Sequence, residues 1–165
     1  MTATTHSAVV TLPTETSIHV VREFAAPARL VWRALTEPEL VKRWWGGDRG
    51  EVTSAEIDLR VGGRWRYVMV VRCGSEFDGT EVAFNGEFRE IEPGARLVNT
   101  EVYEAFPDAP SDVTTVLEED DGRTTLTSVG EYLNREHRDA VIDSGMELGM
   151  QESYDKLEQV AISLA

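Results

Sequence analysis

The sequence is poor in residue types that several classes of protein require. Only one of its 165 residues, Cys73, is a cysteine, which excludes an intramolecular disulfide and any metal site built from several cysteines. Lysine and arginine number 16 against 30 acidic residues, for a formal net charge of −14. Because nucleic-acid affinity comes largely from basic side chains, no nucleic-acid partner is expected, and an anionic membrane surface would repel the chain.

Long apolar runs are also absent. No stretch approaches the roughly 20 residues of a membrane span, and residues 1–13 lack the basic start and apolar middle of a signal peptide. We therefore expect a cytoplasmic protein with no membrane insertion. The threonine-rich, aperiodic segment 1–16 is interpreted as a flexible N-terminal tail, and residues 17–165 as a single domain.

Motifs of common catalytic sites are missing too. The three histidines, His6, His19 and His137, do not have the spacing of metal ligands, and no nucleophile elbow or glycine-rich phosphate loop occurs. Cys73 has no neighbouring histidine and is interpreted as an inert thiol. We predict no metal site, no cofactor and no catalytic residue, so an enzymatic role is left open but is not favoured.

What the sequence does contain is a regular order of structural signals. A strand is expected over residues 17–24, followed by two short helices between residues 27 and 45. The apolar period then becomes two from residue 51 to 132, and turn signals divide this region into antiparallel strands. An apolar stripe at 3.6-residue spacing predicts one long helix from about residue 136 to 164.

Only this last helix has an apolar stripe long enough to cover such a sheet. The sequence therefore predicts an α+β fold, in which a curved antiparallel sheet of six to seven strands wraps around a long C-terminal helix. Gly145 and Gly149 lie at or within the stripe, although glycine inside a helix costs about 1 kcal/mol relative to alanine. Backbone-close packing against the sheet is the favoured explanation, and room beside the helix is the alternative.

Several segments together resemble a known family. They are REFAAP at 22–27, VWRALTEP at 31–38, the tryptophan pair at 44–45, DLRVGG at 58–63, GEFREI at 86–91, RLV at 96–98, GRTTLT at 122–127 and Gly149. The pattern is similar to the START-like (SRPBCC) superfamily, and within it to the C-terminal domain of the activator of the ninety-kilodalton heat-shock chaperone ATPase. The resemblance implies a helix-grip fold, whose sheet and long helix enclose a cavity that holds an apolar or amphipathic molecule in many relatives.

Two departures from the family pattern restrict what the resemblance implies. The eukaryotic co-chaperone docks on the chaperone through a separate N-terminal domain, which the sixteen residues of the predicted tail cannot replace. The tryptophan that often follows the helix glycine is Met150 here. Chaperone activation is therefore not carried over, and the resemblance implies no universal catalytic set.

The residues expected to line a cavity are aromatic, sulfur-containing or small. These pocket candidates are Trp44, Trp45, Trp65, Tyr67, Met69, Phe84, Met146, Gly149, Met150 and Ser153. Because adjacent helical positions are about 100° apart, Trp44 and Trp45 cannot both face one core. We expect one to pack inward and the other to line a cleft mouth or a partner surface, although a core position for both is the more ordinary interpretation.

Polar side chains alternate with apolar ones in the middle of the sheet. Asn85 and Glu87 share one strand face, as do Asn99, Glu101 and Tyr103 on the next strand. A carboxylate facing a cavity would have a raised pKa suited to acid–base chemistry. The favoured interpretation places these side chains in the outer, solvated row of the sheet.

The leading hypothesis is a non-enzymatic binding module that holds a small apolar or aromatic ligand and acts as a carrier, sensor or accessory factor. The first alternative is a cofactor-free enzyme of the polyketide cyclase, dehydratase or hydrolase type, which needs an ionisable group in its pocket. The second alternative is a co-chaperone-like domain that binds protein through the strongly acidic part of the chain, residues 101–165. A homodimer is compatible with the sequence, but no feature predicts one.

Overall fold

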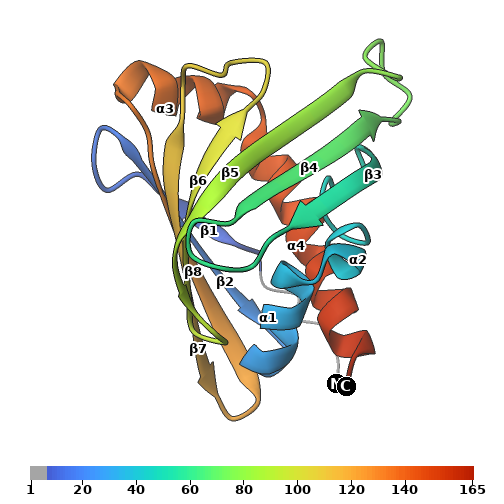
Figure 1. Ribbon diagram of the computed structural model, residues 1–165, viewed down its shortest axis with the longest axis vertical. Helices are drawn as coiled ribbons and strands as arrows, with labels where there is room; N and C mark the ends of the chain where they lie inside the picture. The colour runs from blue at the N-terminus through green and yellow to red at the C-terminus, as the bar shows by residue number, and fades with distance from the viewer. Residues whose placement is uncertain (1–6) are drawn as a thin grey trace.

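The computed structural model describes residues 7–165 (Figure 1). The elements follow one another as β1 (Val9–Thr11), β2 (Ser17–Phe24), α1 (Ala28–Thr36), α2 (Pro38–Val41), β3 (Gly50–Ile57), β4 (Arg64–Val71), β5 (Glu81–Glu92), β6 (Arg96–Tyr103), β7 (Ser111–Asp120), β8 (Arg123–Glu131), α3 (Arg135–Asp143) and α4 (Met146–Ser163). The predicted α+β class, the two short helices and the C-terminal helix are confirmed.

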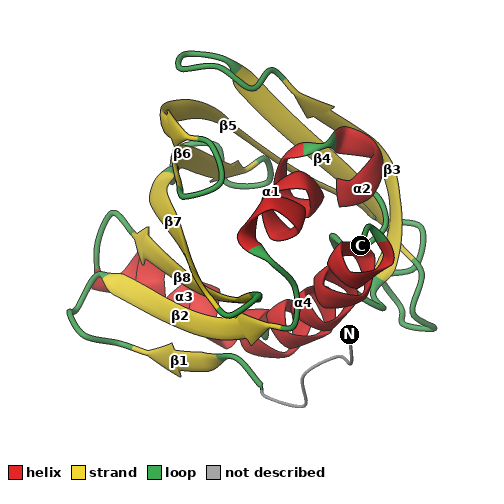
Figure 2. Cartoon of the chain, turned by 90° about the horizontal axis from the view of Figure 1, so that it is seen from below, coloured by secondary structure: helices red, strands yellow, loops and turns green. Residues whose placement is uncertain are grey.

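All eight strands form one antiparallel sheet in the order β1-β2-β8-β7-β6-β5-β4-β3. The sheet curls so that α1 and α4 lie on its concave side (Figure 2). β2 pairs with β8 along its whole length, from Ser17 opposite Glu131 to Phe24 opposite Thr124. This pairing joins strands from the two ends of the chain near one edge of the sheet, and α4 crosses the inside of the curve (Figure 2).

The sheet has more strands than predicted because β1 lies inside the segment interpreted as a tail. β1 pairs with β2, and the side-chain amide of Gln151 bonds both backbone groups of the preceding Ala8 at 2.9 and 2.8 Å. Three paired residues are too few to produce a recognisable alternation in sequence. Residues 1–6 of the predicted tail, including His6, lie outside the described part of the chain.

The long C-terminal helix is broken where one continuous helix was predicted. Gly145 separates α3 from α4 with φ of +83°, a left-handed conformation that favours glycine. A Cβ added at Gly145 would meet nothing within 4 Å, and one at Gly149 would meet only Arg49 Nε at 3.9 Å. The favoured explanation of these glycines, close packing against the sheet, is therefore wrong. The close approach is at Gly47, where a Cβ would lie 2.7 Å from the Cβ of Glu152 on α4.

One half of the interior is a sealed apolar core between α1, the second half of α4, and the adjoining ends of β2, β7 and β8. Its side chains are fully or almost fully buried, and they include Phe24, Leu30, Val31, Ala34, Leu117, Leu126, Leu157 and Ala161. We call this region the sealed core. It contains the second half of the apolar stripe on the C-terminal helix, at Leu157, Val160 and Ala161.

A buried ion-pair network ties α4 to β2 at the edge of the sealed core. Arg22 contacts Asp155 at 2.8 Å and Glu158 at 3.4 Å, and the backbone N–H of Ala25 donates to Glu158 at 3.0 Å. The Arg22 guanidinium also lies 5.1 Å from the ring centroid of Phe24. Charged groups are retained in protein interiors when they are paired and hydrogen-bonded, as Glu158 is here.

Candidate functional site

The other half of the interior contains a carboxylate, Glu101, in the middle of the sheet. Strand alternation places Glu101 on the same face of β6 as Leu97, which packs in a core cluster with Trp65 and Phe88. Burial raises the pKa of Glu101 from its usual 4.5 to about 7, and no hydrogen bond or neighbouring positive charge opposes that rise. Glu101 therefore faces inward, and the favoured placement in the outer row is wrong for this residue.

The Glu101 carboxylate borders accessible space inside the fold. It makes no hydrogen bond or ion pair within residues 7–165, yet in that part of the chain no side-chain oxygen or nitrogen is both sealed from solvent and without a partner. The side chain as a whole is only half-buried. A carboxylate deep enough to be strongly desolvated therefore still has oxygen atoms that a small polar molecule can reach.

Three tyrosines lie within electrostatic range of this carboxylate: Tyr67 from β4, Tyr132 from the segment after β8, and Tyr154 from α4. Burial, and then the negative charge of Glu101, raise the pKa of all three hydroxyls, that of Tyr154 to about 12. None of these hydroxyls bonds another described residue. We call Glu101 and the three tyrosines the inner polar cluster, because at neutral pH it presents three hydroxyl donors and one titratable carboxyl group.

Inward-facing side chains around the cluster also keep accessible surface. On β7, Val113 and Thr115 share the inward face with buried Leu117, yet both are only half-buried, as is Ser128 on β8. On their inward faces the same two strands are buried toward the other end, where Leu117 and Leu126 join the sealed core. Packing is thus dense at one end of the concave face and looser at the other.

Aromatic rings run in continuous contact from this region to the surface. Successive centroids lie 4.8 Å apart for Trp65–Tyr67, 5.5 Å for Tyr67–Trp45, 5.7 Å for Trp45–Phe84, 4.9 Å for Phe84–Tyr103 and 5.7 Å for Tyr103–Phe106. Exposure rises along this aromatic row, from 6% at Trp65 to 65% at Phe106. The row supplies an apolar surface that joins the inner polar cluster to solvent.

The structure separates the predicted pocket residues into distinct places. Trp45, Trp65, Tyr67 and Phe84 belong to the aromatic row. Trp44 is in the sealed core, where its indole N–H donates to the backbone oxygen of Ala34 at 2.8 Å. Trp45 also packs against the sealed core, so both tryptophans contact it, in agreement with the more ordinary interpretation of the pair.

The remaining candidates lie along α4 and β4. Met146 and Met150 pack beside Tyr132 and Tyr154 against buried Ile18 and Val20. Met69, Gly149 and Ser153 instead adjoin the segment after α2, at Gly46, Arg49 and Gly47 respectively. Whether any of these side chains contacts a ligand stays a prediction.

Sequence reasoning missed Tyr103, Tyr132 and Tyr154 as pocket residues. A signal for Tyr154 existed, because it follows Met146 and Met150 at four-residue spacing and so shares their helix face. The inward position of Glu101 was harder to predict from sequence. Its face of β6 carries Leu97 and Tyr103, but the other face carries Val98 and Val102, so neither face is clearly the more apolar one.

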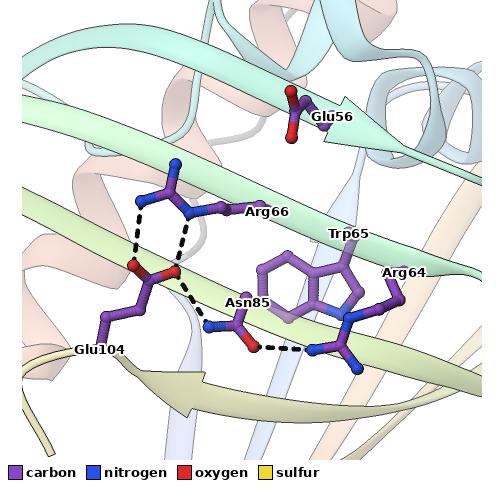
Figure 3. A pocket seen from close by; sticks show the side chains of 6 residues that line it. All are labelled: Glu56, Arg64, Trp65, Arg66, Asn85 and Glu104. Atoms are coloured by element: carbon purple, nitrogen blue, oxygen red, sulfur yellow. Dashed lines mark hydrogen bonds and ion pairs between the residues drawn. The ribbon is translucent and has the colours of Figure 1, made fainter. Parts of the chain in front are cut away.

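The outer row is correctly predicted for Asn85 and Glu87, which face away from the helix. Asn85 also lines an open recess of about 420 Å³ on this face. Its lining residues are Glu56, Arg64, Trp65, Arg66, Asn85 and Glu104 (Figure 3). Arg66 donates to both Glu104 oxygens at 2.9 Å, and the Asn85 amide donates to one of them at 2.9 Å. These bonds lower the pKa of Glu104 to about 2. The polar groups of this recess already satisfy one another, which makes it the weaker ligand site.

Within residues 7–165, no group of three or more histidine, cysteine, aspartate or glutamate side chains is arranged to hold a metal ion. The same part of the chain contains no helix with the length and hydropathy that a membrane crossing needs. Cys73 is exposed in the turn after β4.

A curved antiparallel sheet that grips a C-terminal helix, with two short helices after its first long strand, defines a protein of the helix-grip class within the SRPBCC superfamily. The model of the family described as activator of Hsp90 ATPase homolog 1-like protein matches residues 25–161, and the chain belongs to this family. The family resemblance in the sequence is thereby confirmed. A chaperone partner for this chain stays a prediction.

Solved structures of similar proteins extend over nearly the whole chain. A protein from Rhodobacter sphaeroides is 28% identical with a TM-score of 0.85, covering 94% of this chain and 99% of the other. One from Mycobacterium smegmatis is 25% identical with a TM-score of 0.81, covering 94% and 96%. An AHSA1-like protein from Aeromonas hydrophila, at 21% identity, shares the fold with a TM-score of 0.65 over 88% and 93%. No curated protein matches the chain.

Proposed function

We propose that the protein binds a small molecule between the sheet and α4, and that this ligand joins an aromatic or apolar body to at least one hydrogen-bonding group. The observation that carries the proposal is the inward Glu101 carboxylate without a partner among the described residues. Leaving a buried polar group unpaired is costly, so a fold retains one where water or a ligand meets it. The three hydroxyls of the inner polar cluster supply further anchoring points.

The surroundings of the cluster support an aromatic or apolar ligand body. Ligand sites are mostly apolar with a few placed polar groups, and the aromatic row and the two methionines of α4 provide such walls. The half-buried Val113 and Thr115 indicate that the space is not filled by side chains. Carrier, sensor and accessory roles all follow from reversible binding at this place.

A pair of matched variants tests this proposal. Val113 faces inward on β7 and Val116 faces outward on the same strand, and both are half-buried. Native mass spectrometry of gently purified protein is expected to show an added mass on the wild type and on Val116→Phe, and none on Val113→Phe. Circular dichroism checks that both variants are folded. A bare polypeptide in all three proteins, with no exogenous compound shifting amide signals around Glu101, would contradict internal binding.

A second candidate function is proton-transfer catalysis, which the raised pKa of Glu101 specifically favours. With a pKa of about 7, the carboxyl group exists in both protonation states at neutral pH, as a general acid–base group should. The tyrosine hydroxyls would then stabilise developing negative charge on a substrate oxygen. Deuterium exchange at the acidic carbon of an enolisable aryl ketone measures this activity, and Glu101→Gln should slow it by about 10²–10⁴-fold. Equal rates with both proteins would exclude this role for the tested ketone class.

A further inference from the structure

We propose, resting on the internal binding site above, that its ligand is an amine: a protonated or quaternary ammonium group on an aromatic or apolar body. The ammonium would lie against the Glu101 carboxylate and the faces of the surrounding aromatic rings.

No protein cation compensates the charge of Glu101. On the inward face, the neighbouring strand positions carry Ser111 on β7, whose hydroxyl donates to the Glu101 backbone oxygen at 3.3 Å, and Asn99 and Tyr103 on β6. The groups that interact with Glu101 electrostatically are Tyr67, Tyr132 and Tyr154. Arg22 on β2 interacts electrostatically with Tyr154, and it is engaged by Asp155 and Glu158. An ionised Glu101 therefore needs a counter-ion that the described chain does not provide.

The rings beside Glu101 suit an ammonium group. A cation within about 6 Å of a tryptophan or tyrosine ring is attracted to the negative face of the ring, and more strongly when both are desolvated. Tyr67 contacts both Trp45 and Trp65, and Tyr154 on α4 is a further ring within electrostatic range of Glu101. The hydroxyl oxygens of these tyrosines can also accept hydrogen bonds from a primary ammonium.

Other ligand chemistries fit this site less well. A carboxylate ligand, such as a fatty acid, would place a second negative charge beside Glu101 in a region of low dielectric constant. A purely apolar ligand would displace water from Glu101 and leave its oxygens unpaired. A neutral alcohol can bond the carboxylate but gains no charge pairing. The net charge of −14 on the whole chain further concentrates cations at the protein surface and speeds their encounter with the site.

Three probes of the same shape test the proposal: 3-phenylpropylamine, 3-phenylpropan-1-ol and 3-phenylpropanoate. Amide chemical shifts of the wild type are followed at pH 8, where Glu101 is mainly ionised, in 0.3 M salt to screen surface charges. We expect the amine to bind at least about tenfold more tightly than the alcohol, and the carboxylate not to bind. The affected amides should be those of β6, β7 and the first half of α4.

Two variants and a pH change give the controls. In Glu101→Gln the preference for amine over alcohol should disappear, whereas Glu118→Gln, an exposed position on β7, should keep it. At pH 5.5 the wild type should lose most of its preference, because Glu101 is then largely protonated while the amine stays charged.

The outcomes separate the amine proposal from internal binding itself. Equal affinity for amine and alcohol at the inward amides, or an amine preference that survives in Glu101→Gln, overturns the amine proposal and leaves internal binding standing. If none of the three probes shifts the amides around Glu101, neither idea is supported and both are rejected for ligands of this size.

Discussion

Glu158 and Glu101 both face the inside of the described fold, but one is paired with charged and hydrogen-bonding groups and the other is not. Glu158 on α4 is sealed, contacts Arg22 and accepts the N–H of Ala25. Glu101 on β6 is deep but reachable, and only tyrosines and other uncharged side chains surround it. The first carboxylate is used to hold α4 against the sheet, whereas the second makes no contact that would stabilise the protein.

The comparison shows that one sheet builds two kinds of interior. Where α1 covers the concave face, leucine, valine and phenylalanine close the space completely. Beyond α1, Met146, Met150 and Tyr154 of α4 pack against the sheet with longer side chains, and the tyrosine ends in a hydroxyl group. Stability should therefore come mainly from the first region, and binding from the second. Four predictions test this division, beginning with the largest expected effect.

Glu158→Gln should destabilise the protein by about 3–5 kcal/mol, because removing one partner leaves buried charge less well compensated. Urea unfolding at pH 7 measures the loss. Glu118→Gln, at an exposed position on β7, serves as the matched control and should stay within about 0.5 kcal/mol of the wild type. A loss no larger than that of the control would mean that the network around Arg22 does not hold α4 in place.

Leu157→Ala in the sealed core should cost about 2–5 kcal/mol, since it removes a fully buried side chain from a packed region. Met150→Ala, seven residues earlier on α4 and half-buried, should cost only about 1 kcal/mol because the space beside it is less completely filled. The same unfolding experiment compares the two. Similar losses would contradict the division of α4 into a sealed and an open half.

Glu101→Gln should stabilise the folded protein, by about 3 kcal/mol at pH 8 and by little at pH 4. Folding raises the pKa of Glu101 from 4.5 to about 7, so between these values the folded state binds more protons than the unfolded state. Stability that depends on this group therefore falls as pH rises through that window, and glutamine removes the loss. Unfolding curves at both pH values measure the difference, and a destabilised variant at pH 8 would show that Glu101 has a favourable partner.

Glu104→Gln in the outer recess should have the smallest effect, below about 1 kcal/mol, because exposed ion pairs are screened by solvent. Folding lowers the pKa of Glu104 from 4.5 to about 2 through its bonds with Arg66 and Asn85. Its contribution is therefore present above pH 4.5 and is lost as pH falls toward 2, the opposite direction to Glu101. Thermal melting between pH 2 and 7 should show the variant approaching the wild type at the acid end.

The sequence predicts the order of helices and strands well, because long strands show a clear alternation of apolar and polar residues. The antiparallel strands expected between residues 51 and 132 are present as β3 to β8, from Gly50 to Glu131. β1 was missed because it is too short to alternate visibly, and the break at Gly145 because apolar spacing continues across it. These errors concern local geometry that hydrophobic patterning does not encode.

The candidate site was less predictable, for a different physical reason. Trp45, Trp65, Tyr67 and Phe84 were expected near a cavity from their size and alternation, and they do form the aromatic row. The side of β6 on which Glu101 lies depends on the pairing register of the strand. One face of β6 carries valines and the other carries leucine and tyrosine, so hydrophobicity alone does not show which face is buried. The looser packing around it arises from how far α1 extends over the sheet, a tertiary property absent from local sequence.

The pairing of β2 with β8 also sets the order in which the chain can fold. Glu23 and Arg123, which bridge these strands, are 100 residues apart in sequence. At synthesis rates of about 5–20 residues per second, β2 is synthesised several seconds before β8, and α4 is synthesised after both. The sheet can close around α4 only at the end of synthesis, so the newborn chain has an open concave face until then. The ligand of the proposed internal site would meet an open face at that stage and be enclosed as folding finishes.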